Sequence, residues 1–68
     1  MFIEIEDMIV NLEEVSHIEF RRLTNSIVLN FKDGHAATVN FSSYELSEEV
    51  YDKIRDFLNR RVGIYKLW

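Results

Sequence analysis

Apolar and polar positions alternate with a period of two over the first forty residues, and with a helical period near the carboxyl end. The first pattern predicts half-buried strands and the second predicts an amphipathic helix. We therefore expect four to five short strands followed by one helix. The apolar positions of the expected strands are Ile3 and Ile5, then Met8 to Leu12, then Ile18 and Phe20, then Ile27, Leu29 and Phe31, and last Ala37, Val39 and Phe41.

The connections between these strands differ in how tightly the sequence defines them. Glu6-Asp7 is the expected turn between the first two strands. Residues 11–16 fit either the end of a strand or a single helical turn. Thr24-Asn25-Ser26 is the expected turn of the next hairpin, which places Phe20 opposite Leu29 or a neighbour of it.

The loop at Asp33-Gly34 can be derived from the register. A two-residue turn would place Leu29 and Ala37 on opposite faces of the sheet, because a shift of one residue reverses every side chain. A three-residue loop over 32–34 pairs Leu29 with Ala37 and gives one continuous apolar face. We therefore predict that loop, with Gly34 at positive φ in a bulge.

The last third of the chain carries the signals of an amphipathic helix. Ser47 is the expected N-cap and Gly63 the expected C′ residue. Leu46 and Tyr51 then have the spacing of a hydrophobic staple. An alternative start at Ser42, with Glu45 completing a capping box, would add one turn. The predicted buried stripe consists of Val50, Tyr51, Ile54, Phe57 and Leu58.

These elements predict an α+β fold, an antiparallel β-meander with one C-terminal amphipathic helix packed on one face, as a single domain over residues 1–68. A helix is about 10–12 Å wide and strands lie about 4.8 Å apart, so one helix covers two or three strands. Either the sheet curls into a half-barrel or a second subunit covers the remainder.

Composition narrows the options for stabilising such a small domain. The chain has 68 residues, 47% of them hydrophobic, and no cysteine. Disulfides and thiolate metal sites are therefore excluded, which leaves a well-packed core or self-association. Glu4, Glu6 and Asp7 interrupt the apolar run that a signal peptide would need, and no stretch is long enough to span a membrane. We expect a cytoplasmic protein.

Charge is distributed unevenly along the chain. The net charge is −4, with six acids and no base in residues 1–20. From Lys53 onward there are five bases and only one acid, Asp56. The two ends are either solvated separately or meet, within the fold or between subunits. On the helix, Glu49–Lys53 and Asp56–Arg60 have the spacing of favourable ion pairs.

Side chains that could carry chemistry do not form a recognisable constellation. Ser42 and Ser43 precede a helix, where serines act as caps, and Glu13 and Glu14 are neighbours in a loop. His35 closes a hairpin loop, and His17 is expected on the polar side of its strand. No metal-ligand spacing is present. We expect no catalytic residue, no metal site, no cofactor and no enzymatic activity.

The layout from Asn11 to Leu58 resembles that of several small bacterial proteins with a strand hairpin and a closing helix, among them the flagellar FlbD-type family. Any hairpin followed by a capped helix contains the shared positions, so the resemblance implies this layout alone. Those positions are Ile18-Glu19, Ile27 and Leu29 before Gly34, Glu48-Glu49-Val50 and Ile54.

The carboxyl end provides the main functional hypothesis. Its apolar, aromatic tail must pack on this chain or on another, and both possibilities stay open. We expect a noncatalytic domain that acts through self-association or contact with a protein partner. The alternative is a module that binds single-stranded nucleic acid or another anion through its basic, aromatic end. The candidate interaction residues are Arg60, Arg61, Ile64, Tyr65, Leu67 and Trp68.

Overall fold

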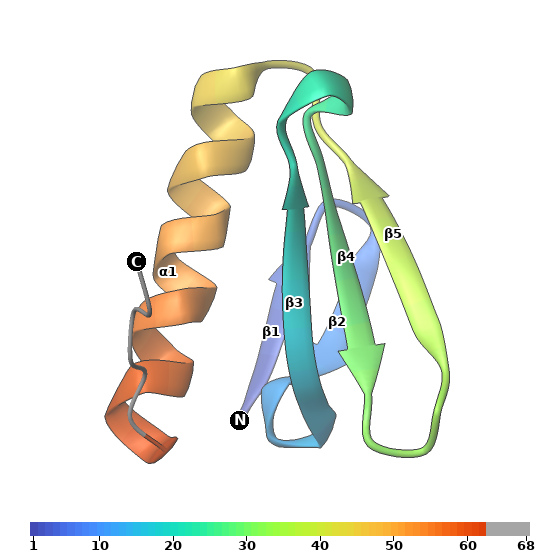
Figure 1. Ribbon diagram of the computed structural model, residues 1–68, viewed down its shortest axis with the longest axis vertical. Coiled ribbons are helices and arrows are strands. Elements are labelled where there is room, and N and C mark those ends of the chain that lie inside the picture. The colour runs from blue at the N-terminus through green and yellow to red at the C-terminus, as the bar shows by residue number, and fades with distance from the viewer. Residues whose placement is uncertain (63–68) are drawn as a thin grey trace.

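A computed structural model describes residues 1–62 of the chain, with side chains for residues 1–60. Its elements are five strands, two short 3₁₀ turns and one C-terminal helix, α1 (Tyr44–Val62). All strand pairs are antiparallel, so the predicted α+β class is confirmed. The strands form two sheets, a hairpin of two strands and a sheet of three (Figure 1).

The first hairpin consists of β1 (Phe2–Ile5) and β2 (Met8–Asn11) and turns at the predicted Glu6-Asp7. The chain then makes a 3₁₀ turn, η1 (Leu12–Glu14). Asn11 caps this turn, because its side-chain oxygen accepts a hydrogen bond from the Glu13 N–H at 3.1 Å. Of the two possibilities for residues 11–16, the helical turn is therefore present. It ends the first ladder, which is why the strands form two sheets.

The second sheet has the order β3-β4-β5, from β3 (Val15–Arg21), β4 (Ser26–Phe31) and β5 (Ala36–Asn40). The turn between β3 and β4 begins earlier than predicted, at η2 (Arg22–Thr24). Asn25 follows in the left-handed conformation, with φ of 52°, and Ser26 already belongs to β4. Phe20 pairs with Ile27, two residues from Leu29 on the same face.

The loop between β4 and β5 has the predicted length and register. Leu29 pairs with Ala37, and the Phe31 N–H donates to the His35 carbonyl at 2.8 Å. Gly34 has a φ of +96°, a conformation that favours glycine. The Gly34 N–H donates to the Phe31 carbonyl at 3.0 Å, and the His35 N–H donates instead to Asp33 Oδ1 at 2.9 Å. This is the predicted glycine bulge.

The helix begins before its predicted N-cap. Ser43 caps α1, since its Oγ accepts from the Leu46 N–H at 3.2 Å. Ser47 is buried inside the helix and its hydroxyl donates to the Tyr44 carbonyl at 2.7 Å. The prediction of Ser47 as N-cap is wrong, and the alternative at Ser42 is one residue early. The Leu46–Tyr51 staple is wrong for the same reason, because both residues lie within the helix. Gly63 lies outside the described residues.

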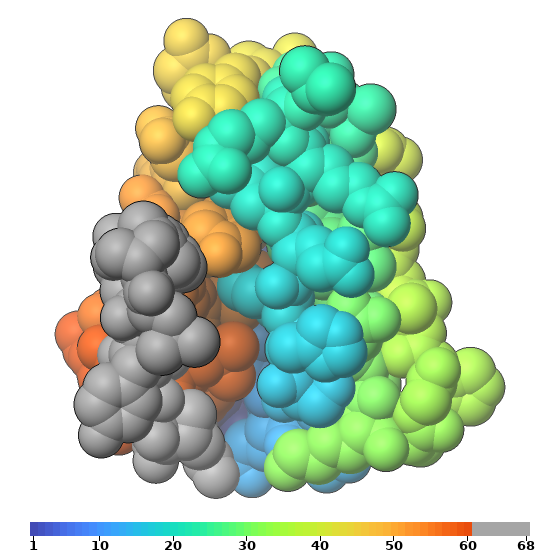
Figure 2. Space-filling model, viewed as in Figure 1, coloured from blue at the N-terminus to red at the C-terminus, as the bar shows by residue number. Residues whose placement is uncertain are grey.

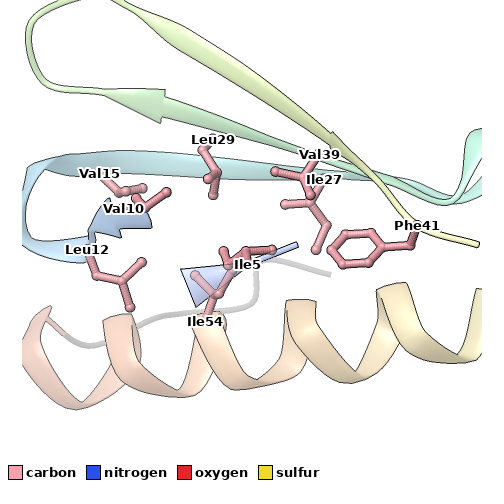
Figure 3. Packing of buried hydrophobic residues seen from close by; sticks show 9 residues of the cluster. All are labelled: Ile5, Val10, Leu12, Val15, Ile27, Leu29, Val39, Phe41 and Ile54. Carbon is pink, nitrogen blue, oxygen red and sulfur yellow. The ribbon is translucent and has the colours of Figure 1, made fainter. Parts of the chain in front are cut away.

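The core lies between three walls, which are the three-stranded sheet, the β1–β2 hairpin and α1 (Figure 3). The predicted helical stripe faces it, with Ile54 buried and its other members half-buried. One helix does not cover the sheet alone, and the first hairpin covers the remainder from within the same chain. The buried cluster is Ile5, Val10, Leu12, Val15, Ile27, Leu29, Val39, Phe41 and Ile54.

Candidate interaction surface

Most of the interaction residues predicted from the sequence fall outside the described side chains. Arg61 belongs to the last described turns of α1 by its backbone alone, and residues 64–68, with Ile64, Tyr65, Leu67 and Trp68, lie outside the described residues. Arg60 is exposed, and its Nη2 lies 3.0 Å from Asp56 Oδ2. The predictions for the tail therefore remain predictions.

The bases of α1 whose side chains are described each lie beside an acid of the same helix. Lys53 Nζ lies 3.6 Å from Glu49 Oε2, and the Arg60–Asp56 pair has the same spacing of one turn. Arg55 Nη2 lies 3.5 Å from Asp52 Oδ1. Both ion pairs predicted from the sequence are present. Every Lys or Arg whose side chain is described on α1 thus has an acidic neighbour, so this stretch carries no unpaired basic stripe.

The outer face of the first hairpin exposes large apolar side chains. Ile3 and Val10 face the core, so Phe2 and Ile9 point away from it. Phe2 is 71% exposed and Ile9 is 72% exposed. Phe2 pairs with Asn11 in the ladder, which makes Ile9 its diagonal neighbour on the same face. The two side chains form one small apolar surface, here called the hairpin patch.

Sequence reasoning missed the hairpin patch although the signal was present. The turn at Glu6-Asp7 fixes the register of β1 on β2, and with it the face of each residue. Alternation from Ile3 and Ile5 then assigns Phe2 to the outer face, and the pairing of Ile3 with Val10 assigns Ile9 to it as well. The aromatic tail is the stronger apolar signal, and it lies at the other end of the chain.

A groove of about 510 Å³ separates β1 from α1. Its lining includes the core residues Ile5, Phe41 and Ile54. Glu4 and Glu6 also line it, and neither has an ion-pair partner among the described residues. Lys53, Asp56 and Arg60 of α1 line it as well, so the groove combines an apolar lining with three acidic and two basic side chains.

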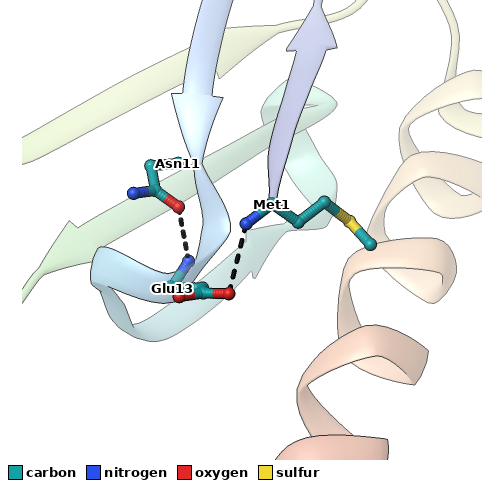
Figure 4. Close-up of polar contacts among 3 residues, drawn as sticks. All are labelled: Met1, Asn11 and Glu13. Atoms are coloured by element: carbon teal, nitrogen blue, oxygen red, sulfur yellow. Dashed lines mark hydrogen bonds and ion pairs between the residues drawn. The ribbon is translucent and has the colours of Figure 1, made fainter.

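Met1 lies at one end of this groove, with its side chain directed toward the helix (Figure 4). The terminal ammonium of Met1 lies 3.3 Å from Glu13 Oε2. Glu13 therefore ties the start of β1 to η1, and Asn11 holds the backbone of Glu13 in place. Glu13, one of the two neighbouring acids of the loop expected from the sequence, is engaged in this contact.

Aromatic rings pack between β3 and α1, on the side of the helix away from the groove. The Phe20 ring stacks on Tyr51 at 5.0 Å and on Tyr44 at 5.8 Å between centroids. Arg22 Cζ lies 4.9 Å from the Phe20 centroid, and Arg55 Cζ lies 5.9 Å from that of Tyr51. In Figure 2 the start of α1 and the end of β3 adjoin in this region. The stack attaches the helix to the edge of the sheet.

Both histidines are exposed, as predicted, and each contacts one neighbour. His35 Nδ1 lies 2.9 Å from Asp33 Oδ2. This contact raises the pKa of His35, first through the hydrogen bond and then through the charge of Asp33. The pKa of Asp33 is lowered, chiefly because its carboxylate accepts from the His35 backbone N–H. The pair stabilises the loop around Gly34.

His17 lies beside Ser16, which a bulge in β3 places on the same side of the strand. Ser16 Oγ and His17 Nδ1 are 3.0 Å apart. Ser16 Oγ also donates to the Asn30 carbonyl at 3.1 Å, so the Ser16–His17 contact is tied to the neighbouring strand β4.

Two further features are absent from residues 1–62. No group of three or more His, Asp or Glu side chains is arranged to hold a metal ion. No helix in this part of the chain is long and apolar enough to cross a membrane. Comparison of the chain with protein-family models, with curated proteins and with solved structures gave no match.

Proposed function

We propose that this chain is a noncatalytic domain that acts by binding protein, and that its first partner is a second copy of itself. The observation that carries the proposal is the hairpin patch. Phe2 and Ile9 stand side by side on one sheet face and are each more than two-thirds exposed. Isolated apolar residues on a surface are ordinary, but adjacent ones on an exposed face of a strand pair favour an interface.

The energies involved are large for so small a domain. Burying a Phe or Ile side chain fully contributes about 1.5–3 kcal/mol. Small domains have total stabilities of about 5–15 kcal/mol, and chains of this length lie toward the lower end. Association that covers the hairpin patch in two copies would therefore stabilise the folded chain appreciably, in the way that oligomerisation stabilises many small scaffolds.

Charge argues for this proposal over the alternative of a nucleic-acid or anion-binding module. Such modules present bases free to contact phosphates. The described bases of α1 pair with acids of the same helix. Glu4 shares the outer face of the hairpin with the two apolar residues and also lines the groove, where it would repel phosphate. The proposal includes a cytoplasmic location, the default for a chain without cysteine.

The double variant Phe2→Thr/Ile9→Thr tests the proposal. Threonine keeps the strand preference while removing most of the apolar surface. We expect the solution mass, measured by light scattering after size exclusion, to fall to that of one chain while the circular dichroism spectrum is retained. Leu23→Thr is the matched control, because Leu23 is 102% exposed in η2 and far along the chain from the hairpin. An unchanged mass in the double variant, or an equal loss in the control, would contradict the proposal.

A further inference from the structure

The edge of β1 that faces the groove has no partner strand among the described residues. β1 pairs with β2 on its other side only. The Leu12 N–H donates to the Met1 carbonyl at 2.9 Å, so by the alternation of an antiparallel ladder Ile3 and Ile5 also bond across to β2. Phe2 and Glu4 consequently direct their backbone N–H and C=O groups to the open edge. This edge is a template for one more strand.

The side chains of β1 determine which residue types an added strand needs at each position. Ile3 and Ile5 point inward, and Phe2 and Glu4 point outward. Neighbouring strands place their side chains on matching faces, so an added strand needs apolar residues beside Ile3 and Ile5. Between them, on the outer face, it needs a group that suits Glu4. A lysine or arginine meets that requirement.

Residues 64–68 have this pattern in their sequence. Lys66 stands between Tyr65 and Leu67, and Ile64 and Trp68 flank them. With Lys66 beside Glu4, Tyr65 and Leu67 fall beside Ile3 and Ile5 in either strand direction. A slip of one residue would place Lys66 on the inner face, so the pattern selects the face of each residue. A slip of two residues toward Phe2 would keep these faces but remove Lys66 from Glu4, so the opposite charges favour the register with Lys66 beside Glu4.

Length and charge agree with this placement. Five extended residues span about 17 Å. The wall that α1 gives the groove runs from Leu46 to Arg60, which corresponds to about 21 Å of helix. The groove on the other side of α1 has a less favourable balance of charge for Lys66. Among the described residues, it is lined by Lys32 and Arg55 against the single acid Glu13. In the groove beside β1 the acids Glu4, Glu6 and Asp56 outnumber the bases Lys53 and Arg60.

We propose that residues 64–68 of one copy add to β1 of a second copy as a third strand, with Lys66 beside Glu4. The inference rests on the proposed self-association and names its interface. Exchange in both directions gives a closed, twofold-symmetric dimer in which each hairpin receives the other's tail. In the antiparallel direction Trp68 lies beside Phe2 on the outer face, so the added strand covers the Phe2 side of the hairpin patch. It also brings the basic end of one chain to the acidic end of its partner.

Charge reversal in the full-length chain tests the pairing. Glu4→Lys and Lys66→Glu each place like charges together, and we expect each to raise the dimer dissociation constant on the order of tenfold. The double variant Glu4→Lys/Lys66→Glu should return it to within about twofold of the original. Glu14→Lys is the matched control, since this exposed acid is not part of the groove and should change nothing.

Mixing the two single variants distinguishes exchange between copies from docking within one chain. In a mixed dimer, one contact joins the original Lys66 to the original Glu4. The other contact joins the two substituted positions, which again carry opposite charges, so an equimolar mixture should regain the original dissociation constant. Trp68 is the single tryptophan of the chain, and its emission should shift to longer wavelength as the dimer is diluted.

Each failure has its own meaning. A dimer insensitive to both charge reversals overturns this inference and leaves self-association standing. Rescue by the double variant without rescue by mixing, together with Trp68 emission independent of dilution, assigns the tail to its own chain and likewise overturns it. A chain that is monomeric at all concentrations contradicts the proposed function and this inference together.

Discussion

Asp33 and His35 show how a short loop uses charged residues without burying them. Both are exposed, and each shifts the pKa of the other, that of Asp33 downward and that of His35 upward. The stabilisation from His35 is complete below its ordinary pKa and is lost as pH rises through the raised value. The stabilisation from Asp33 is complete above its ordinary pKa and is lost as pH falls through the lowered value. The pair therefore contributes between about pH 4 and pH 6.5.

A titration followed by nuclear magnetic resonance tests this pair. The ring protons of His35 should titrate with a midpoint above the ordinary histidine pKa of about 6.5. Asp33→Asn should lower that midpoint, because the amide keeps the shape of the side chain and removes its charge. An unchanged midpoint in Asp33→Asn would mean that the carboxylate does not cause the shift.

Among the residues, those with a unique conformational requirement were predictable from the sequence. Gly34 was placed correctly because only one loop length puts Leu29 and Ala37 on one face, and that loop requires positive φ. Asn25 was placed in the turn but not in its left-handed position. Asparagine tolerates that conformation without requiring it, so its identity does not fix the turn.

At the scale of elements, periodicity located the strands and the helix, while the ends of the helix depended on competing caps. Ser42, Ser43 and Ser47 each fit an N-cap by residue type. The choice of Ser43 follows from packing, because a start at Tyr44 brings the Tyr44 ring onto Phe20. That contact joins positions 24 residues apart in the sequence, and local signals do not report it.

Ser43→Ala tests the observed start of the helix. Loss of the cap should reduce the free energy of unfolding by about 1 kcal/mol. Ser42→Ala, at the neighbouring exposed position, should change it by less than about 0.5 kcal/mol. Urea unfolding followed by circular dichroism measures both. A larger loss in Ser42→Ala than in Ser43→Ala would show that the helix starts elsewhere.

In the molecule as a whole, the separation into two sheets reduces the apolar sheet area that α1 must cover. A single meander would leave part of its apolar face open beside one helix. Instead η1 redirects the chain, and Ile5 and Val10 of the first hairpin join the core against Leu29 and Val39. The sequence allowed either outcome at residues 11–16, so this arrangement could not be derived from local pattern.

Because of the division into two sheets, the candidate interaction site lies on the first hairpin and not on the main sheet. The uncovered apolar surface is the outside of the first hairpin, and the open strand edge is that of β1. Sequence reasoning expected an uncovered apolar surface, and it offered a contact between the acidic and basic ends as one possibility; association through either stays a prediction. The sequence analysis placed this surface on the main sheet. Whether residues 12–14 form a turn determines which strands remain exposed, and the sequence alone does not settle that.

The solution mass of the unmodified chain, measured by light scattering at low and at high salt, tests self-association. We expect a species of twice the chain mass of 8.2 kDa that survives high salt, because burial of apolar side chains dominates the interface. A mass of one chain under both conditions, up to the highest accessible concentration, would contradict it.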